Sequence, residues 1–227
     1  NVQATALLMD FLANDPSLKV RRVVLASSRS IYGEGAYVRT GAPQGPRLTP
    51  APRSAEALRR GAWDPVCPET GAALSPVPTR EDDRPAPASI YAATKLMQED
   101  LVRIGCAGSG AGYAILRLQN VYGEGQSLAN PYTGILSIFS TRIRRGLELP
   151  VFEDGLESRD FVHVSDVVAA FSAAISRAED PNTEVNVGSG VATPVVEVAR
   201  ALCRAFGMPE SVRITGQYRL GDIRHNM

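Results

Sequence analysis

Short apolar runs rich in β-branched residues alternate with helix-like stretches along most of this chain. The runs that are typical of buried strands lie at residues 22–27, 113–118, 160–164 and 184–188. Apolar residues at helical spacing lie between and around them, at residues 1–11, 91–104, 133–145, 165–176 and 194–207. Strands that alternate with helices predict an α/β protein with a doubly wound, mostly parallel sheet that has helices on both faces.

Capping residues mark the ends of the last two predicted helices. Ser165 is expected to be the N-cap of the helix at 165–176, with Asp166 in its first turn. Pro194 suits the first position of the following helix, and Gly207 suits its C-terminal end. The predicted core face of that helix consists of Val195, Val198, Ala199, Leu202 and Phe206.

The segment from Glu34 to Ile90 interrupts this alternation. It carries ten of the sixteen prolines, and only residues 54–60 have the pattern of a short helix. Loops of this length are uncommon and are usually functional or partly disordered. We therefore expect an insert with few regular elements at 34–90, close to the substrate.

Composition excludes several classes of protein. Lys plus Arg and Asp plus Glu both number 24, a balance that argues against a nucleic-acid binder and against polybasic attachment to a membrane. No apolar run reaches the roughly 18 residues of a membrane span. The three cysteines are too few and too scattered for a disulfide framework, so a reducing cytoplasm is the expected location. The chain starts at Asn1 within a helical pattern, which we interpret as part of a longer protein.

Tyr91 and Lys95 form the pair most suggestive of chemistry. They stand four apart at the start of a predicted helix and so share one face. An ammonium beside a phenol favours the phenolate, which can act as a general base or acid on an alcohol or a carbonyl. Alone, the spacing is most often a chance surface pair. Ser28 strengthens it, because it ends a predicted strand where ligands bind in open α/β sheets, although such a hydroxyl often bonds its own backbone.

Other polar residues stand next to predicted strands. Asn120 follows one strand, and Arg159, a residue type suited to phosphate, precedes another. His163 lies within an apolar strand and is expected to be a core histidine. Cys67 has Thr70 where a zinc knuckle needs a second cysteine, so no metal site is expected there.

Seven sequence blocks resemble the extended short-chain dehydrogenase/reductases, the NAD-dependent nucleotide-sugar epimerase/dehydratase family. The blocks occur along the chain in the order that is found in that family. The stretches 119–127, 130–139 and 152–160 are most similar to the dTDP-L-rhamnose 4-epimerase-like subgroup. The blocks start at Asn1, Ser27, Ser89, Leu116, Arg159, Asn186 and Tyr218.

The resemblance implies a Rossmann-type sheet that holds NAD, with NADP not excluded, and a smaller C-terminal substrate-binding part. It divides the chain at about residue 123, with 1–123 in the dinucleotide-binding domain and 124–227 mainly in the substrate part. The Gly-rich phosphate loop of the family has no match here and would lie upstream of Asn1. A homodimer formed through the helices at 1–11 and 91–104 is also implied.

The resemblance further assigns the site residues. The implied catalytic residues are Ser28, Tyr91 and Lys95. The implied contacts to the cofactor are Asn1, Ala26, Ser27, Tyr91, Lys95 and Leu118. The implied contacts to the nucleotide sugar are Ser28, Asn120, Asn130, Phe152, Arg159 and Arg219.

The implied reaction is inversion at C4 of a nucleotide-diphosphate hexose through a 4-keto sugar, with a dTDP-6-deoxyhexose such as dTDP-rhamnose first and a UDP-hexose second. A 4-ketoreductase that consumes NADPH is the first alternative, and a non-catalytic sugar-nucleotide-binding protein is the second. A dehydratase is disfavoured, because Ser28-Arg29-Ser30 stands where dehydratases of the family resemble Thr-Asp-Glu.

Overall fold

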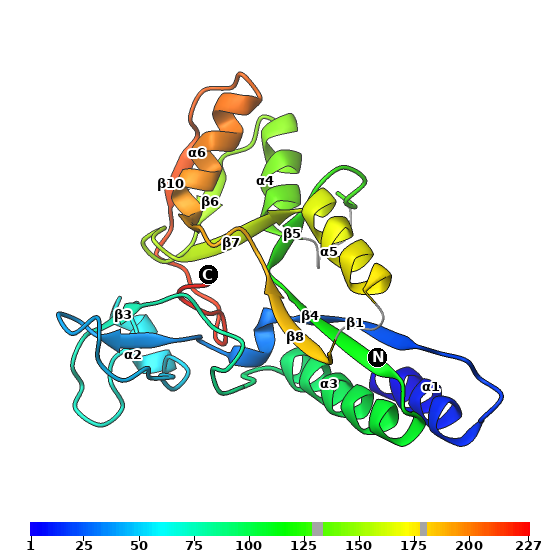
Figure 1. Ribbon diagram of the computed structural model, residues 1–227. Coiled ribbons are helices and arrows are strands. Elements are labelled where there is room, and N and C mark those ends of the chain that lie inside the picture. The colour runs from blue at the N-terminus through cyan, green and yellow to red at the C-terminus, as the bar shows by residue number, and fades with distance from the viewer. Residues whose placement is uncertain (129–133, 178–180) are drawn as a thin grey trace. The chain divides into compact units, whose positions relative to one another are not determined.

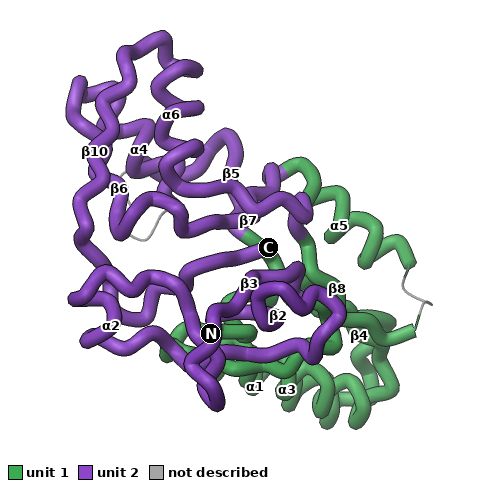
Figure 2. Tube along the Cα trace, turned by 90° about the vertical axis from the view of Figure 1, so that its left-hand side faces the viewer, with its two compact units in different colours: residues 1–33, 80–119, 165–187 green, residues 34–79, 120–164, 188–227 purple. Residues whose placement is uncertain are grey.

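The computed structural model describes residues 1–128, 134–177 and 181–227 (Figure 1). Its contacts separate the chain into two compact units, each assembled from three stretches (Figure 2). Unit 1 comprises Asn1–Gly33, Arg80–Gln119 and Ser165–Val187, and unit 2 comprises Glu34–Thr79, Asn120–Val164 and Gly188–Met227. The domain boundary at residue 123 stays a prediction, because these units interleave along the chain.

Unit 1 is built on a parallel sheet, as the alternation of elements predicts. The strands β1 (Arg22–Ser28), β4 (Gly112–Leu118) and β8 (Thr183–Val187) lie in the order β1-β4-β8. Both pairings are parallel, and Ser28 is level with Leu118, which is level with Val187. The carboxyl ends of the three strands therefore form one edge.

Helices lie on both faces of this sheet. On one face, α1 (Val2–Asn14) and α3 (Ile90–Ser109) lie side by side, and their apolar residues pack on Val23, Leu25 and Tyr113 (Figure 1). The two helices approach closely at Gly105, where an added Cβ would lie 2.7 Å from the Cβ of Met9. The helix α5 (Val164–Ser176) lies on the opposite face. Its small residues border a hollow together with Leu116 of β4. The Leu116 side chain points to that face because alternate residues of a strand point to opposite sides, and Tyr113 points toward α1 and α3.

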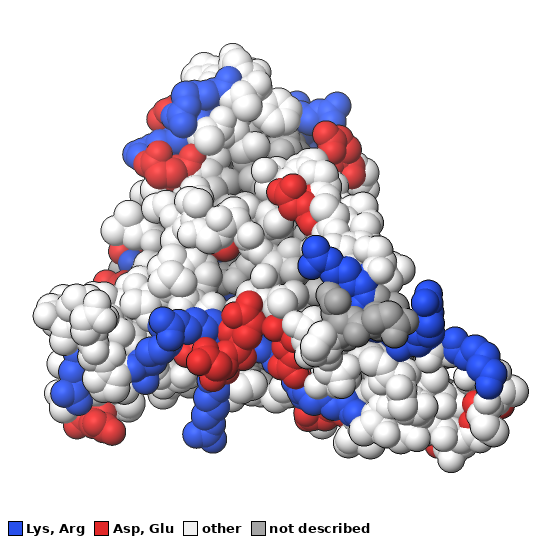
Figure 3. Space-filling view, viewed as in Figure 1, with Lys and Arg blue, Asp and Glu red and all other residues white. Residues whose placement is uncertain are grey.

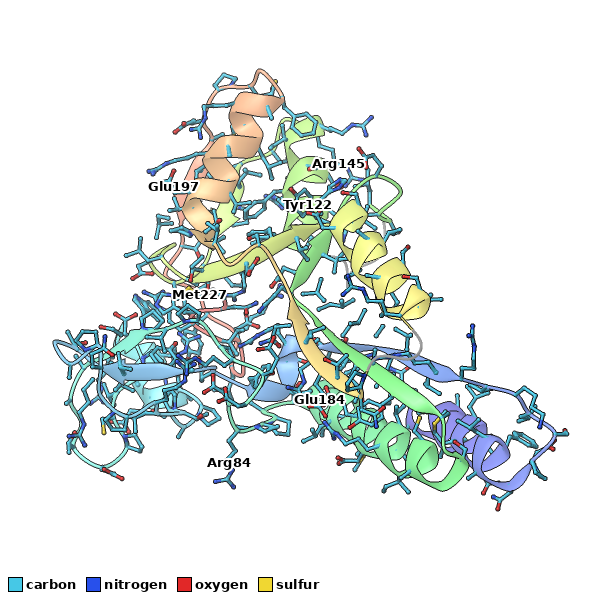
Figure 4. All side chains as sticks on the ribbon, in the orientation of Figure 1. Arg84, Tyr122, Arg145, Glu184, Glu197 and Met227 are labelled. Atoms are coloured by element: carbon cyan, nitrogen blue, oxygen red, sulfur yellow. The ribbon has the colours of Figure 1, made fainter. Side chains whose placement is uncertain are left out.

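A buried charge cluster joins α3 to the sheet. The Glu99 side chain is fully buried and accepts hydrogen bonds from Arg117 Nη2 (2.9 Å), Arg117 Nε (3.1 Å) and Ser27 Oγ (2.5 Å). Arg103 donates to Glu99 at 2.8 Å and to Glu184 at 2.7 Å. Glu184, which Figure 4 labels on β8, also bonds Arg117. Burial alone would lower the pKa of Arg117, but its hydrogen bonds to Glu99 raise it above the usual value. All of these residues belong to unit 1.

Unit 2 contains most of the insert, Glu34–Thr79, and the elements nearest the C-terminus. Within the insert, β2 (Tyr37–Arg39) pairs antiparallel with β3 (Leu74–Pro76), and the expected short helix is α2 (Ala55–Arg59), capped by Ser54. The strand β7 (Ser158–His163) lies between a parallel β5 (Asn120–Tyr122) and an antiparallel β9 (Ala192–Pro194).

A second small sheet and two helices complete unit 2. The strands β6 (Leu149–Val151) and β10 (Val212–Ile214) are parallel. They pack with α4 (Ile135–Arg144) and α6 (Val195–Ala205) around a core that includes Phe139, Leu149, Val151 and Ala199. The short strands β2, β3, β5, β6, β9 and β10 were not expected from the sequence, because three-residue strands carry too little periodicity to be detected.

Two predicted helix starts are wrong. The helix α5 starts at Val164, so Ser165 lies inside its first turn rather than at the N-cap. Pro194 is the N-cap of α6, not its first helical residue, because it still ends the extended strand β9. Phe206 was predicted to lie on the core face of this helix, but it is 42% exposed. Cys203 of α6 is buried instead. The C-terminal glycine Gly207 does adopt positive φ, as predicted.

The distribution of charged side chains on the surface agrees with the equal numbers of acidic and basic residues. On the face that Figure 3 shows, acidic and basic side chains are interspersed over most elements. Within the described ranges no helix is both long and apolar enough to cross a membrane. The three cysteines are free and buried.

The cluster around Glu99 makes Arg117 a sensitive site for stability. Replacing Arg117 by Met leaves the buried Glu99 carboxylate without its main partner, and we expect a loss of about 3–5 kcal/mol in the free energy of unfolding. Arg200→Met, which breaks an exposed pair with Glu197, is the control and should cost less than about 1 kcal/mol. Urea unfolding of the full-length variants measures both, and equal midpoints would contradict the expectation.

Candidate functional site

Tyr91 and Lys95 lie on the first two turns of α3, which Ser89 caps by accepting a hydrogen bond from the Ala92 N–H at 3.1 Å. Tyr91 is 52% exposed, and the Lys95 ammonium lies 6.0 Å from the centre of its ring. Lys95 Nζ donates to the Ala26 carbonyl at 2.9 Å, which holds the start of α3 against the end of β1. Burial lowers the pKa of Lys95.

Ser28 is the last residue of β1 and is half-buried. Its Oγ accepts a hydrogen bond from the Ser30 N–H at 3.2 Å and so caps the short 3-10 helix Arg29–Tyr32. The backbone role that is common for such serines is therefore present. A hydroxyl that accepts one bond can still donate its proton. Ser28, Tyr91 and Lys95 all belong to unit 1.

The other residues predicted to contact a cofactor differ in what they offer. Ala26 is exposed, and its carbonyl already binds Lys95. The Ser27 hydroxyl is buried against Glu99, so only its backbone is available to a ligand. Leu118 ends β4 beside Ser28, and the exposed Asn1 is the N-cap of α1 without a side-chain bond.

Unit 2 contains a cavity of about 540 Å³, a size typical of small-molecule sites. It brings together Asn120, Phe152, Arg159 and Arg219, four residues predicted to contact a substrate. Of the other two predicted contacts, Ser28 belongs to unit 1 and Asn130 lies outside the described residues. The cavity also has apolar walls from α4 and β6, which include Ile135, Ile138, Phe139 and Val151.

The polar groups in this cavity suit an anion with an aromatic part. The Arg219 guanidinium lies 5.2 Å from the centre of the Phe152 ring. Arg159 Nη1 donates to the Ser158 and Arg224 carbonyls at 2.8 Å and 3.2 Å. Across the described residues, its other nitrogens make no hydrogen bond. Asn120 Oδ1 accepts from Asn226 Nδ2 at 2.8 Å, which orients the Asn120 amide.

Phe152 is held by a strained neighbour. Glu153 has a φ of 49°, a left-handed conformation that is uncommon for residues other than glycine. Its buried carboxylate binds Arg53 Nη1 of the insert at 2.8 Å and Arg224 Nη1 of the C-terminal segment at 3.1 Å. Arg53 also donates to the Asp222 carbonyl at 2.8 Å. The insert therefore contacts two segments that line the cavity, and its place near the substrate stays a prediction.

Some cavity residues were missed by the sequence reasoning. Glu157, Asp222 and Arg142 line the cavity, but none of them was predicted to contact a ligand. A signal existed for Glu157, since residues two apart in extended chain point to the same side and Arg159 was already a candidate.

The two histidines lie in different surroundings. His163 is not the core histidine that was expected, because its side chain is 34% exposed and lies 3.4 Å from Glu124. It borders a separate cavity of about 630 Å³ in unit 2. His225 shares a hydrogen bond of 2.9 Å with Ser158, and burial, with a contribution from Arg224, lowers its pKa to about 4. No group of three or more His, Cys, Asp or Glu residues able to hold a metal occurs in the described part of the chain.

A family model described as "Epimerase: NAD dependent epimerase/dehydratase family" matches residues 67–188, more than half of the chain. The chain belongs to this family, which confirms the resemblance found in the sequence.

One protein that is similar to this chain is a dTDP-L-rhamnose 4-epimerase of Burkholderia thailandensis. It is 38% identical over 226 residues, which are 99% of this chain and 59% of that protein. This chain thus spans little more than half the length of that relative.

Solved structures confirm the Rossmann-type α/β fold. MoeE5 in complex with UDP-glucuronic acid and NAD superposes with a TM-score of 0.73 at 28% identity, over 100% of this chain and 60% of that one. The UDP-glucose 4-epimerase of Thermotoga maritima with UDP-glucose gives a TM-score of 0.70 at 25% identity, over 99% of this chain and 60% of that one.

Proposed function

We propose that the protein containing this chain is an NAD-dependent epimerase that inverts C4 of a nucleotide-diphosphate hexose. A dTDP-6-deoxyhexose such as dTDP-rhamnose is the first choice of substrate, and a UDP-hexose is the second. The observation that carries the proposal is the Lys95 ammonium, which lies beside Tyr91 and is anchored on Ala26, two residues before Ser28. The 38% identical rhamnose epimerase supports the choice of sugar nucleotide.

Each member of the catalytic trio has a distinct role in this proposal. Tyr91 takes the proton from the C4 hydroxyl of the sugar, and it later returns a proton to the same oxygen when the hydride that left C4 comes back to the other face of the sugar. Lys95 stabilises the negative charge that forms on the Tyr91 oxygen. Ser28 donates a hydrogen bond to the same sugar oxygen. The trio serves oxidation and reduction equally, which epimerisation through a 4-keto sugar requires.

The residues present suit a dinucleotide. The carboxyl ends of β1, β4 and β8 lie level, and Lys95 supplies an ammonium there that can bond ribose hydroxyls. Asn1, Ala26, Ser27, Tyr91, Lys95 and Leu118 are the proposed contacts. Bound NAD supplies a reversible electron acceptor for C4.

The cavity of unit 2 is proposed to bind the nucleotide diphosphate. Arg159 and Arg219 are suited to the two phosphates, because a guanidinium binds phosphate oxygens in pairs. Phe152 offers a ring on which a base can stack. Asn120, oriented by Asn226, is assigned to the sugar.

Replacing Tyr91 by Phe tests the trio. The variant lacks the proton-transferring oxygen, so kcat of the full-length enzyme should fall by about 10²–10⁴-fold, while the affinity for the nucleotide sugar stays near that of the wild type. Tyr122→Phe, which alters a tyrosine of unit 2 outside the trio, is the matched control. Turnover near the wild-type rate in the Tyr91 variant would remove Tyr91 from the mechanism.

A 4-ketoreductase is the alternative, and cofactor use separates the two activities. An epimerase regenerates its cofactor in each cycle, so full-length enzyme incubated with dTDP-hexoses and no added cofactor should interconvert two C4 epimers. The measurement is chromatography of the sugars with absorbance at 340 nm as a monitor of NAD(P)H. The reductase would be favoured by two results together: NADPH is oxidised in proportion to an added 4-keto sugar, and the C4 epimers do not interconvert when NADPH is absent.

We also propose that the protein is a cytoplasmic homodimer. The exposed faces of α1 and α3 carry apolar side chains that a second copy can cover, including Leu8 (64%), Phe11 (64%) and Ile104 (72%). A stable pair of this kind buries at least about 1,200 Å². Free, buried cysteines suit a reducing compartment.

Sedimentation of the full-length protein at micromolar concentration should therefore give a dimer. Phe11→Glu, which places a charge within the apolar face, should shift the protein to monomers, whereas Lys19→Glu beyond the end of α1 should not. A wild-type monomer would reject the proposed pair.

A further inference from the structure

Glu157 is the one acidic side chain that is more than nine-tenths buried and also lines the cavity of unit 2, as judged from the described residues. It is 6% exposed. No described residue forms a hydrogen bond or an ion pair with its carboxyl group, although other buried carboxylates of the unit, such as Glu153, bind arginines directly. A buried carboxyl group without a partner is costly unless it is neutral or a ligand pairs with it.

Charges of both signs surround this carboxyl group. Burial is the largest influence and raises the pKa of Glu157; Glu153 and Asp222 act in the same direction, whereas Arg159 and Arg224 oppose it. Two further arginines, Arg142 on α4 and Arg219 near the C-terminus, line the same cavity. Arg224 is already paired with Asp154 at 2.7 Å, so Arg159 and Arg219 are the cations best placed to meet an anionic ligand.

We propose that Glu157 contacts the nucleotide diphosphate sugar as a neutral carboxylic acid, and that binding of this anion is coupled to uptake of one proton by Glu157. The inference rests on the proposed function, because it needs a diphosphate in this cavity. A diphosphate engages Arg159 and Arg219 and cancels the positive charge that favours the carboxylate form. It also repels a carboxylate directly, whereas a protonated carboxyl group can donate a hydrogen bond to a phosphate or sugar oxygen.

The proton balance is simple. A carboxylate at Glu157 takes one proton from the solvent, and no other covalent bond forms or breaks. His225 hydrogen-bonds Ser158 next to Glu157, but its pKa of about 4 keeps it neutral over the neutral and alkaline range. Because protonation and binding favour each other, affinity should fall as pH rises above the pKa of Glu157 in the free protein, by at most about tenfold per pH unit for one proton.

The test uses full-length protein and UDP-glucose or dTDP-glucose, whose diphosphates are esterified at both ends and so have no ionisation near neutral pH. Titration calorimetry in two buffers with different ionisation enthalpies gives the number of protons taken up on binding. The variant is Glu157→Gln, which keeps the shape and a hydrogen-bond donor. The control is Glu197→Gln on the exposed side of α6, which pairs with Arg200 (Figure 4).

The expected result is proton uptake by the wild type and the Glu197 variant above neutral pH, and none by Glu157→Gln. The Gln variant should bind with an affinity that does not change with pH, and it should bind more tightly than the wild type in the alkaline range. Equal uptake by wild type and Glu157→Gln would overturn the inference. So would a wild type that binds without uptake, a result that needs no variant to fold. Failure of the wild type to bind either sugar nucleotide would instead overturn the proposed function, and the inference with it.

Discussion

The buried pairing of Glu99 with Arg117 is the interaction on which the arrangement of the trio depends. Glu99 lies one turn beyond Lys95 on α3, and its carboxylate binds the side chains of Ser27 on β1 and Arg117 on β4. The same helix holds the carbonyl of Ala26 through Lys95. A charge that is fully buried tolerates little displacement, because each lost hydrogen bond would leave it uncompensated. The helix that carries Tyr91 is thus fixed against the strand that ends at Ser28.

Unit 2 uses the same principle for a different purpose. The insert and the C-terminal segment both send an arginine to Glu153, and this pairing maintains a left-handed backbone next to Phe152. Asp160 plays a related part, since its carboxylate accepts hydrogen bonds from the backbone of Ser189 and Gly190. A proline-rich segment with little regular structure can therefore be essential to a cavity, because its contribution is one buried arginine rather than a folded domain.

The hydrogen-bond partners of a buried charged residue distinguish a structural role from a ligand-binding role. Glu99 and Glu153 have their full complement of arginine contacts, and both act within the structure. Glu157 is almost as buried but has no such contact among the described residues. That difference, rather than burial alone, directs attention to Glu157 as a group that meets the nucleotide sugar.

The sequence by itself determined the α/β class, the parallel strands of unit 1, most of the long helices and the family, because periodicity and motif order are properties of neighbouring residues. It also indicated the Tyr91–Lys95 pair, whose four-residue spacing on a helix places both side chains on one face. Only the tertiary structure revealed the short strands of unit 2, the exposed setting of His163 and the gathering of Asn120, Phe152, Arg159 and Arg219 around one cavity. These features depend on contacts between segments as far apart as Arg53 and Glu153 or Asn120 and Asn226. No local pattern encodes such contacts, since their energies depend on burial and pairing that exist only once the chain has folded.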